Sequence, residues 1–201
     1  MIYKFVFTFA MSFLICSCSI GINTPTAEAS DSTIKIEKYS DANIREVEIG
    51  KSFSLEKIKS MTTFDGEFKK MSDVECGGFF TEEEIGESGE EAIYQYGNME
   101  VDITDNQGAI MKIVGIPDGL RIKYNELLID NNFNPKSLSL EKFEFYKNKA
   151  TVSDNTVGIE STGIKTAYDI MYSVREKTSD NLLYLSFLDN KLVAIRVLVQ
   201  C

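Results

Sequence analysis

Residues 99–116 read MEVDITDNQGAIMKIVGI, and this stretch decides the predicted fold. Met99–Thr104 and Ala109–Ile116 are apolar-rich runs of strand length, and residues 105–108 (DNQG) separate them. Asx and Gly residues between two such runs predict a β-hairpin, because these residues accept the backbone conformations of a tight turn. The preceding run Ile93–Tyr96 extends the hairpin to a three-strand meander.

A second stretch near the end of the chain has the same pattern. Residues 182–199 form two apolar runs around a turn at residues 189–191 (DNK), and residues 170–174 show the two-residue period of a strand ahead of them. A shorter hairpin is predicted at residues 143–152, with its turn at residues 147–148. The second half of the chain is therefore also expected to form antiparallel strands.

Two short helices are predicted ahead of these meanders. Ser54 can cap a helix in which Leu55, Ile58 and Met61 recur on one face. Beyond Gly119, apolar residues recur at i, i+4, i+7 and i+8, which predicts a second amphipathic helix. The residues of this second stripe are Leu120, Tyr124, Leu127 and Leu128.

Together these elements predict an α+β fold with two layers, built from two related helix-plus-antiparallel-meander units. The units would be repeats at residues 44–116 and 117–201, within a domain that begins at residue 33. The alternative is that two unrelated hairpins with Asp-Asn turns resemble one another.

Composition excludes several classes of function. The 201 residues are 43% hydrophobic, which is enough to build a core, and the formal net charge is −10. No basic stripe with interleaved aromatic residues occurs, so we expect no nucleic-acid binding. Histidine is absent, which removes imidazole-based triads and most zinc hydrolase sites but leaves carboxylate, lysine and tyrosine chemistry open. We expect no cofactor and no metal site.

The amino-terminal stretch Phe5–Cys18 has the features of a secretory signal that ends in a cysteine. Lys4 precedes an apolar run that is too short to span a bilayer, since spanning takes roughly 20 helical residues. The sequence resembles bacterial lipoproteins, in which a small residue precedes the modified cysteine and an aliphatic residue lies three positions before it. Ser17 and Ile15 match these places.

This resemblance implies a signal peptide at residues 1–17, a lipid on Cys18 and a flexible tether at residues 18–32, with Cys16 as the alternative acceptor. It also implies membrane attachment through the lipid. Ser19 directly follows the predicted lipidated cysteine, and in this respect the sequence resembles lipoproteins that are sent to the outer membrane. We therefore expect the protein in the outer membrane, facing the periplasm.

Two cysteines remain if Cys18 carries the lipid. In an oxidising compartment two thiols usually pair, so we predict a disulfide between Cys76 and Cys201. The alternative is two free thiols.

The mature chain also resembles the small outer-membrane-assembly lipoproteins and the two-repeat β-lactamase inhibitory proteins, which combine a glycine-led helix with a meander that ends in an Asx-rich turn. The stretches that carry the likeness are residues 49–61, 105–113 and 189–197. The resemblance implies protein binding without catalysis.

The main candidate site is an acidic segment at residues 82–91 that follows two aromatic residues. It lacks the ligand spacing of calcium-binding loops, so a cationic partner is the functional interpretation, and a solvated loop is the alternative. The aromatic pair is expected either to form an exposed contact tip or to anchor the segment to the core. The candidate partner-binding residues are Phe79, Phe80, Glu82, Glu83, Glu84 and Glu87.

Two further groups of residues can each be interpreted either as a functional site or as ordinary structure. Glu100 and Asp102 share one face of a strand, where paired carboxylates can hydrolyse glycosides, although pairing with Lys112 is the simpler expectation. Four tyrosines can form an interface patch or pack in the core. They are Tyr94, Tyr96, Tyr172 and Tyr184.

The sequence therefore predicts an envelope lipoprotein that binds another protein without catalysis, most simply an immunity or inhibitor protein in the periplasm whose acidic surface meets a basic partner. One alternative is an accessory lipoprotein of envelope assembly. An alternative of another class is a carboxylate-dependent hydrolase or a small-ligand carrier.

Overall fold

The computed structural model describes residues 46–62, 64–74, 78–85, 89–149, 156–159 and 163–200. The chain divides into the units Met1–Asp31 and Ser32–Cys201, and every described residue belongs to the second. The predicted signal peptide, Cys18 and the predicted Cys76–Cys201 disulfide lie outside the described residues, as does Glu87.

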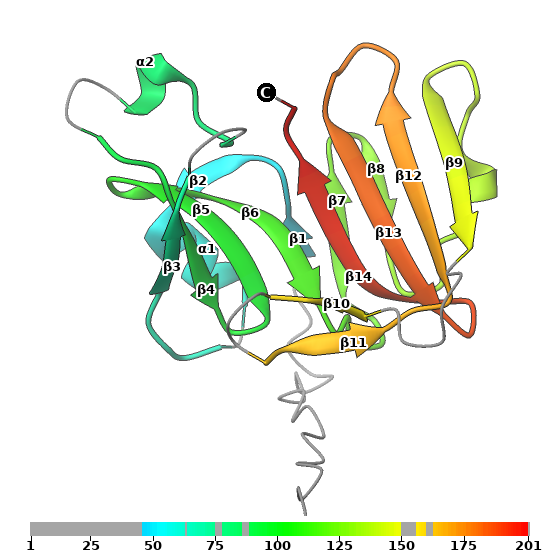
Figure 1. Ribbon diagram of the computed structural model, residues 1–201, viewed down its shortest axis with the longest axis horizontal. Coiled ribbons are helices and arrows are strands. Elements are labelled where there is room, and N and C mark those ends of the chain that lie inside the picture. Colours follow the sequence, from blue (N-terminus) through cyan, green and yellow to red (C-terminus); the bar gives the residue numbers. More distant parts are fainter. Residues whose placement is uncertain are drawn as a thin grey trace, which may run out of the picture. The chain divides into compact units, whose positions relative to one another are not determined.

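A large antiparallel sheet dominates the structure (Figure 1). Its nine strands are β2 (Ser52–Ser54), β3 (Lys69–Asp73), β4 (Ala92–Tyr96), β5 (Met99–Thr104), β6 (Gln107–Val114), β9 (Phe143–Lys149), β12 (Ile170–Glu176), β13 (Leu182–Leu188) and β14 (Lys191–Leu198). The order is β3-β4-β5-β6-β14-β13-β12-β9. β2 also pairs with β6, at residues 107–109, whereas β14 pairs with residues 112–114 of the same strand. The two meanders thus join through the antiparallel pair β6–β14.

Smaller elements lie against this sheet. A three-stranded sheet contains β1 (Glu46–Glu48), β7 (Arg121–Tyr124) and β8 (Leu127–Ile129), with β1 parallel to β7. A two-stranded hairpin contains β10 (Thr156–Gly158) and β11 (Lys165–Ala167). The helices among the described residues are α1 (Leu55–Met61), α2 (Glu82–Ile85) and the 3-10 turn Pro135–Ser137.

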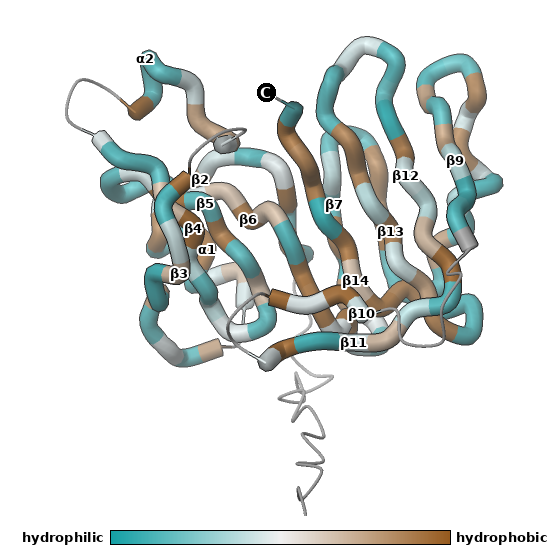
Figure 2. The backbone as a smooth tube through the Cα atoms, viewed as in Figure 1, coloured by the Kyte–Doolittle hydropathy of each residue, from teal (hydrophilic) through white to brown (hydrophobic). Residues whose placement is uncertain are grey.

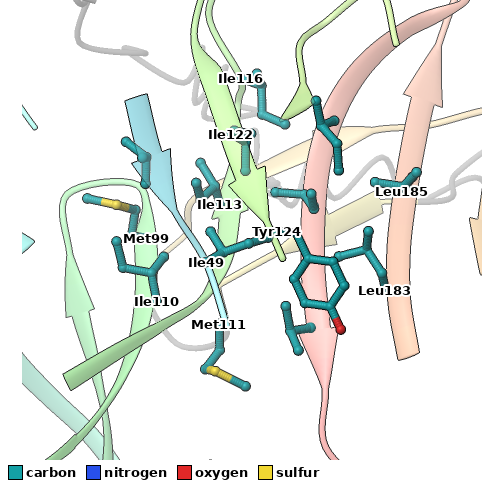
Figure 3. Packing of buried hydrophobic residues seen from close by; sticks show 14 of the residues in the cluster. Ile49, Met99, Ile110, Met111, Ile113, Ile116, Ile122, Tyr124, Leu183 and Leu185 are labelled. Atoms are coloured by element: carbon teal, nitrogen blue, oxygen red, sulfur yellow. The ribbon is translucent and has the colours of Figure 1, made fainter. Parts of the chain in front are cut away.

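One face of the large sheet packs against α1 and the sheet β1-β7-β8 to form the main core. Alternation along the strands sends Val101 and Ile113 to this face, where they lie with Ile58 of α1. Figure 3 shows Ile122 and Tyr124 of β7 among side chains of the large sheet. Each such fully buried side chain contributes about 1.5–3 kcal/mol. In Figure 2 the hydrophobic residues follow the strands, and hydrophilic residues gather at the turns.

The predicted α+β fold with two helix-plus-meander units is wrong, because the structure is mainly antiparallel β-sheet. The chain beyond Gly119 forms β7 and β8 in place of the predicted helix. Leu120 and Tyr124 fit a helical spacing, but Ile122 between them is buried as well, which is the two-residue period of a strand. Asn125, with φ of 51°, then turns the chain into β8.

The strands of both meanders are confirmed, and so is the cap of α1. Met99–Thr104 and Leu182–Leu188 form β5 and β13, and Asp105 and Asp189 take the left-handed conformation in the turns that follow. The side chain of Ser54 accepts a hydrogen bond from the Lys57 N–H at 3.2 Å. The predicted turn at residues 147–148 is wrong, because β9 continues through it and pairs with β12.

Candidate functional site

The face of the large sheet opposite the main core carries a row of polar and aromatic side chains that crosses eight strands. Residues directly opposite one another on antiparallel strands point to the same face. The row consists of Lys69, Gln95, Glu100, Lys112, Arg196, Tyr184, Ser173 and Tyr146. We call this surface the polar face, and the candidate sites lie on it or beside it.

Five of the six predicted partner-binding residues, all but Glu87, are described and lie in a loop next to the polar face. The described residues of this loop are 78–85 and 89–91, and we call it the acidic loop. Its short helix α2 begins with a capping box: the Thr81 N–H donates to the Glu84 carboxylate at 2.9 Å, and the Glu84 N–H donates to the Thr81 hydroxyl at 3.4 Å. Glu82, Glu83 and Glu84 are all exposed. The sequence TEEE thus explains both the helical turn and the display of three carboxylates.

The aromatic pair holds the acidic loop to the body of the protein. Phe80 is only 6% exposed and belongs to the main core cluster, and Phe79 packs edge-on against it with ring centroids 5.1 Å apart. Of the two expected roles for this pair, the structure places Phe80 in the anchoring one. The groups of this loop that a partner could contact are then the exposed glutamates and the half-buried Phe79.

Glu91 fixes the same loop through its side chain. Its carboxylate accepts hydrogen bonds from the backbone N–H groups of Phe79 at 2.7 Å and Phe80 at 3.3 Å, and the residue is 8% exposed. Burial raises the pKa of Glu91, while these N–H groups oppose that shift. A Cβ at Gly78 would lie 1.9 Å from a Glu91 carboxylate oxygen, so a larger residue there would displace the Glu91 side chain.

Asp102 on β5 lies beside Glu91 and is 6% exposed. Burial raises the pKa of Asp102 to about 7, and the negative charges of Glu91 and Glu100 add to this effect. The protonated Asp102 carboxyl group can therefore donate a hydrogen bond to Glu91. The expected pairing with Lys112 is confirmed for Glu100, whose carboxylate lies 3.2 Å from the Lys112 ammonium.

A pocket of about 620 Å³ lies between the hairpin β10–β11 and the polar face. The hairpin is fixed by Ile159, which is 2% exposed and packs with Val114 and Ala194 of the sheet. The polar side chains that line the pocket are Lys112, Thr156, Lys165, Tyr168, Tyr184, Ser186 and Arg196. Among the described residues, no aspartate or glutamate lines it.

The four tyrosines do not form a patch. Tyr96 and Tyr172 are buried in the main core, and Tyr94 packs against that core. Tyr184 lies on the polar face instead. Core packing, the alternative interpretation of these residues, therefore holds for three of the four.

Sequence patterns did not reveal Glu91 or the pocket. Glu91 ends a run of acidic residues, and its neighbour Glu90 is exposed, so nothing local distinguishes the buried carboxylate from the solvated ones. Arg196 and Tyr168 reach the same pocket only because β11 folds back against β14. Predicting the pocket would therefore require knowledge of the contact between β11 and β14.

No family model, no curated protein and no solved structure matches this chain. Within the described residues, no helix has the length and apolar character needed to cross a membrane. The same part of the chain contains no cluster of three carboxylate or thiol side chains that could hold a metal ion.

Proposed function

We propose that this protein is a membrane-anchored envelope lipoprotein that acts by non-catalytic protein binding, as an immunity or inhibitor protein in the periplasm. The lipid anchor and the location are supported by the stretch Phe5–Cys18, with its signal-like apolar run and terminal cysteine. The binding activity is supported by one structural observation above all, the acidic loop. It displays three exposed carboxylates on a turn that is fastened at several points.

The fastening matters because ordering a loop on binding costs free energy. Phe80 buries its ring in the core, Glu91 accepts two backbone N–H groups of the loop, and Thr81 caps α2. A partner that meets Glu82–Glu84 therefore meets groups whose backbone is already positioned. Such preorganisation lowers the entropic cost of association.

Charge identifies the kind of partner. The formal net charge is −10, and three adjacent exposed carboxylates add a local negative potential at the acidic loop. Such a field attracts a basic surface and speeds its diffusional encounter. A toxin or hydrolase with a cationic rim around its active site has the matching chemistry, and occupying that rim would block it.

The experiment that tests this proposal is affinity capture from detergent-solubilised envelopes with three forms of the protein. The first is wild type, and the second carries Glu82→Gln, Glu83→Gln and Glu84→Gln. The control carries Glu46→Gln, Glu56→Gln and Glu141→Gln, which removes three exposed carboxylates elsewhere. Wild type and control should capture the same protein, identified by mass spectrometry, and the acidic-loop variant should lose it. Equal capture by all three forms would refute binding through this loop.

A further inference from the structure

The pocket beside the hairpin β10–β11 has a composition unlike the rest of the molecule. The protein carries a formal net charge of −10, yet the described residues that line this pocket include three cations and no carboxylate. The cations are Lys112 and Arg196 from the sheet and Lys165 from the hairpin. The pocket is thus a local positive region on an acidic protein, and the chemistry it complements is that of an anion.

Several polar groups of the pocket are available to a ligand. Among the described residues, the side chains of Arg196, Tyr184, Tyr168 and Ser186 form no hydrogen bond or ion pair. A guanidinium group presents paired N–H donors that match a carboxylate, and a phenol can add a third donor. Arg196 and Tyr184 are directly opposite one another on β14 and β13, so their side chains leave the same face side by side.

The charge available in the pocket suits a single negative charge. Lys112 is already paired with Glu100 at 3.2 Å, so its charge is largely compensated. When Asp102 on β5 is ionised, its negative charge also acts on Arg196, which disfavours a ligand with two or more charges. Within the described residues, Arg196 and the exposed Lys165 are the pocket cations that form no ion pair.

The walls of the pocket are apolar and its size is that of a ligand site. Val157 and Ile164 of the hairpin and Met171 and Leu198 of the sheet line it. A volume of about 620 Å³ falls within the range of roughly 300–1,000 Å³ that is typical of small-molecule sites. Methionine adapts to apolar ligands of different shape, because its side chain is unbranched and polarisable.

We propose that this pocket binds a small amphipathic monoanion, whose carboxylate pairs with Arg196 and Tyr184 and whose apolar body lies along Val157, Ile164 and Met171. The inference does not depend on the proposed protein binding, because no described residue of the acidic loop lines the pocket. The ligand class is an organic acid with a chain or ring, such as a medium-chain fatty acid or an aryl carboxylate.

The test uses the purified full chain with octanoate, uncharged octanamide and inorganic phosphate as probes. Binding is followed by titration calorimetry and by NMR of methyl-labelled methionine, with the Met171 signal assigned from Met171→Leu. The variant is Arg196→Gln, and the matched control is Arg121→Gln, which removes one exposed arginine from β7 outside the pocket. Circular dichroism verifies that both variants are folded.

Octanoate should bind saturably and shift the Met171 methyl signal. Arg196→Gln should weaken octanoate binding about tenfold or more, because it removes the charged hydrogen-bond donor of the carboxylate. Arg121→Gln should bind octanoate like wild type, and octanamide should bind about tenfold more weakly. The proposal fails if octanoate does not bind saturably, if Arg196→Gln binds it like wild type, or if octanamide binds equally well. Displacement of octanoate by phosphate at similar concentration would show a simple anion site and would also overturn it. The acidic-loop variant should keep octanoate binding, so this test and that of partner capture fail separately.

Discussion

The carboxylate of Glu91 accepts a hydrogen bond from the backbone N–H of Phe79 at 2.7 Å, and this contact ties the acidic loop to the residue that immediately precedes β4. The Phe80 N–H adds a second bond to the same oxygen at 3.3 Å. Two consecutive N–H groups thus donate to one buried carboxylate. The position of the exposed glutamates of α2 depends in turn on this arrangement.

Glu91→Ala should destabilise the protein, because it leaves the Phe79 and Phe80 N–H groups without this acceptor. The expected loss is about 1–3 kcal/mol in the free energy of unfolding. Urea denaturation at neutral pH measures it. Glu90→Ala is the matched control, since Glu90 is exposed, and it should change stability by less than about 0.5 kcal/mol. Equal effects of the two substitutions would show that the contact does not fix the loop.

Asp102 should make stability fall as pH rises. Its pKa is about 7 in the folded protein against an ordinary value of 3.8, so between these values the folded state holds a proton that the unfolded state has lost. Stability is therefore highest below about pH 4, declines up to about pH 7 and is level above that for this group. The raised pKa of Glu91 acts in the same direction.

Asp102→Asn should remove most of that decline. Between pH 4 and pH 8 the free energy of unfolding of the variant, relative to that of wild type, should rise by about 1–4 kcal/mol, since one pKa unit corresponds to about 1.4 kcal/mol. Urea denaturation at several pH values measures the difference. Parallel pH profiles for wild type and variant would show that Asp102 titrates normally in the folded state.

Gly50 has φ of 65°, and a Cβ there would lie 3.0 Å from the Tyr124 ring. Gly50→Ala should therefore cost backbone strain of about 1–2 kcal/mol together with crowding against Tyr124. Gly163→Ala is the control, because Gly163 has φ of 76° and no atom within 4 Å of its added Cβ. Thermal or urea unfolding should show the larger loss for Gly50→Ala. A larger loss at Gly163 would contradict the tight packing of β7 on this turn.

Cys18→Ser should abolish lipidation, since the thiol at position 18 is the predicted acceptor. Intact-mass analysis of the protein from the envelope should show the acylated mass for wild type and for Cys16→Ser, and its loss for Cys18→Ser. The variant should also leave the membrane fraction, because its predicted anchor is gone. Acylated Cys18→Ser would assign the lipid elsewhere.

Local turn chemistry made part of the fold predictable. The hairpins around Asp105 and Asp189 have apolar runs on both sides, and their turn residues accept positive φ, so sequence and structure agree there. The chain after Gly119 was ambiguous, because a stripe of residues four apart contains Leu120 and Tyr124 but not the equally buried Ile122. Four residues are too few to separate a period of 2.0 from one of 3.6.

The remaining parts of the fold and of the site could not be predicted, because they depend on pairing between residues far apart in the chain. The parallel contact of β1 with β7 joins residues more than seventy positions apart in the chain, and no local signal marks it. The same holds for the pocket, which requires the hairpin β10–β11 to return over Lys112 and Arg196. The acidic run was visible in sequence, but the buried role of Glu91 was not, because its chemistry is that of its exposed neighbours.

The salt dependence of association tests the proposed binding activity most directly. The association rate constant of wild type with its captured partner, measured by surface plasmon resonance, should fall about tenfold or more between about 50 and about 300 mM NaCl. The variant with glutamine at positions 82, 83 and 84 should associate more slowly at low salt and respond weakly to salt. The control with glutamine at positions 46, 56 and 141 should respond more like wild type. An association rate that is indifferent to salt, or the same for wild type and the acidic-loop variant, would contradict binding through these carboxylates.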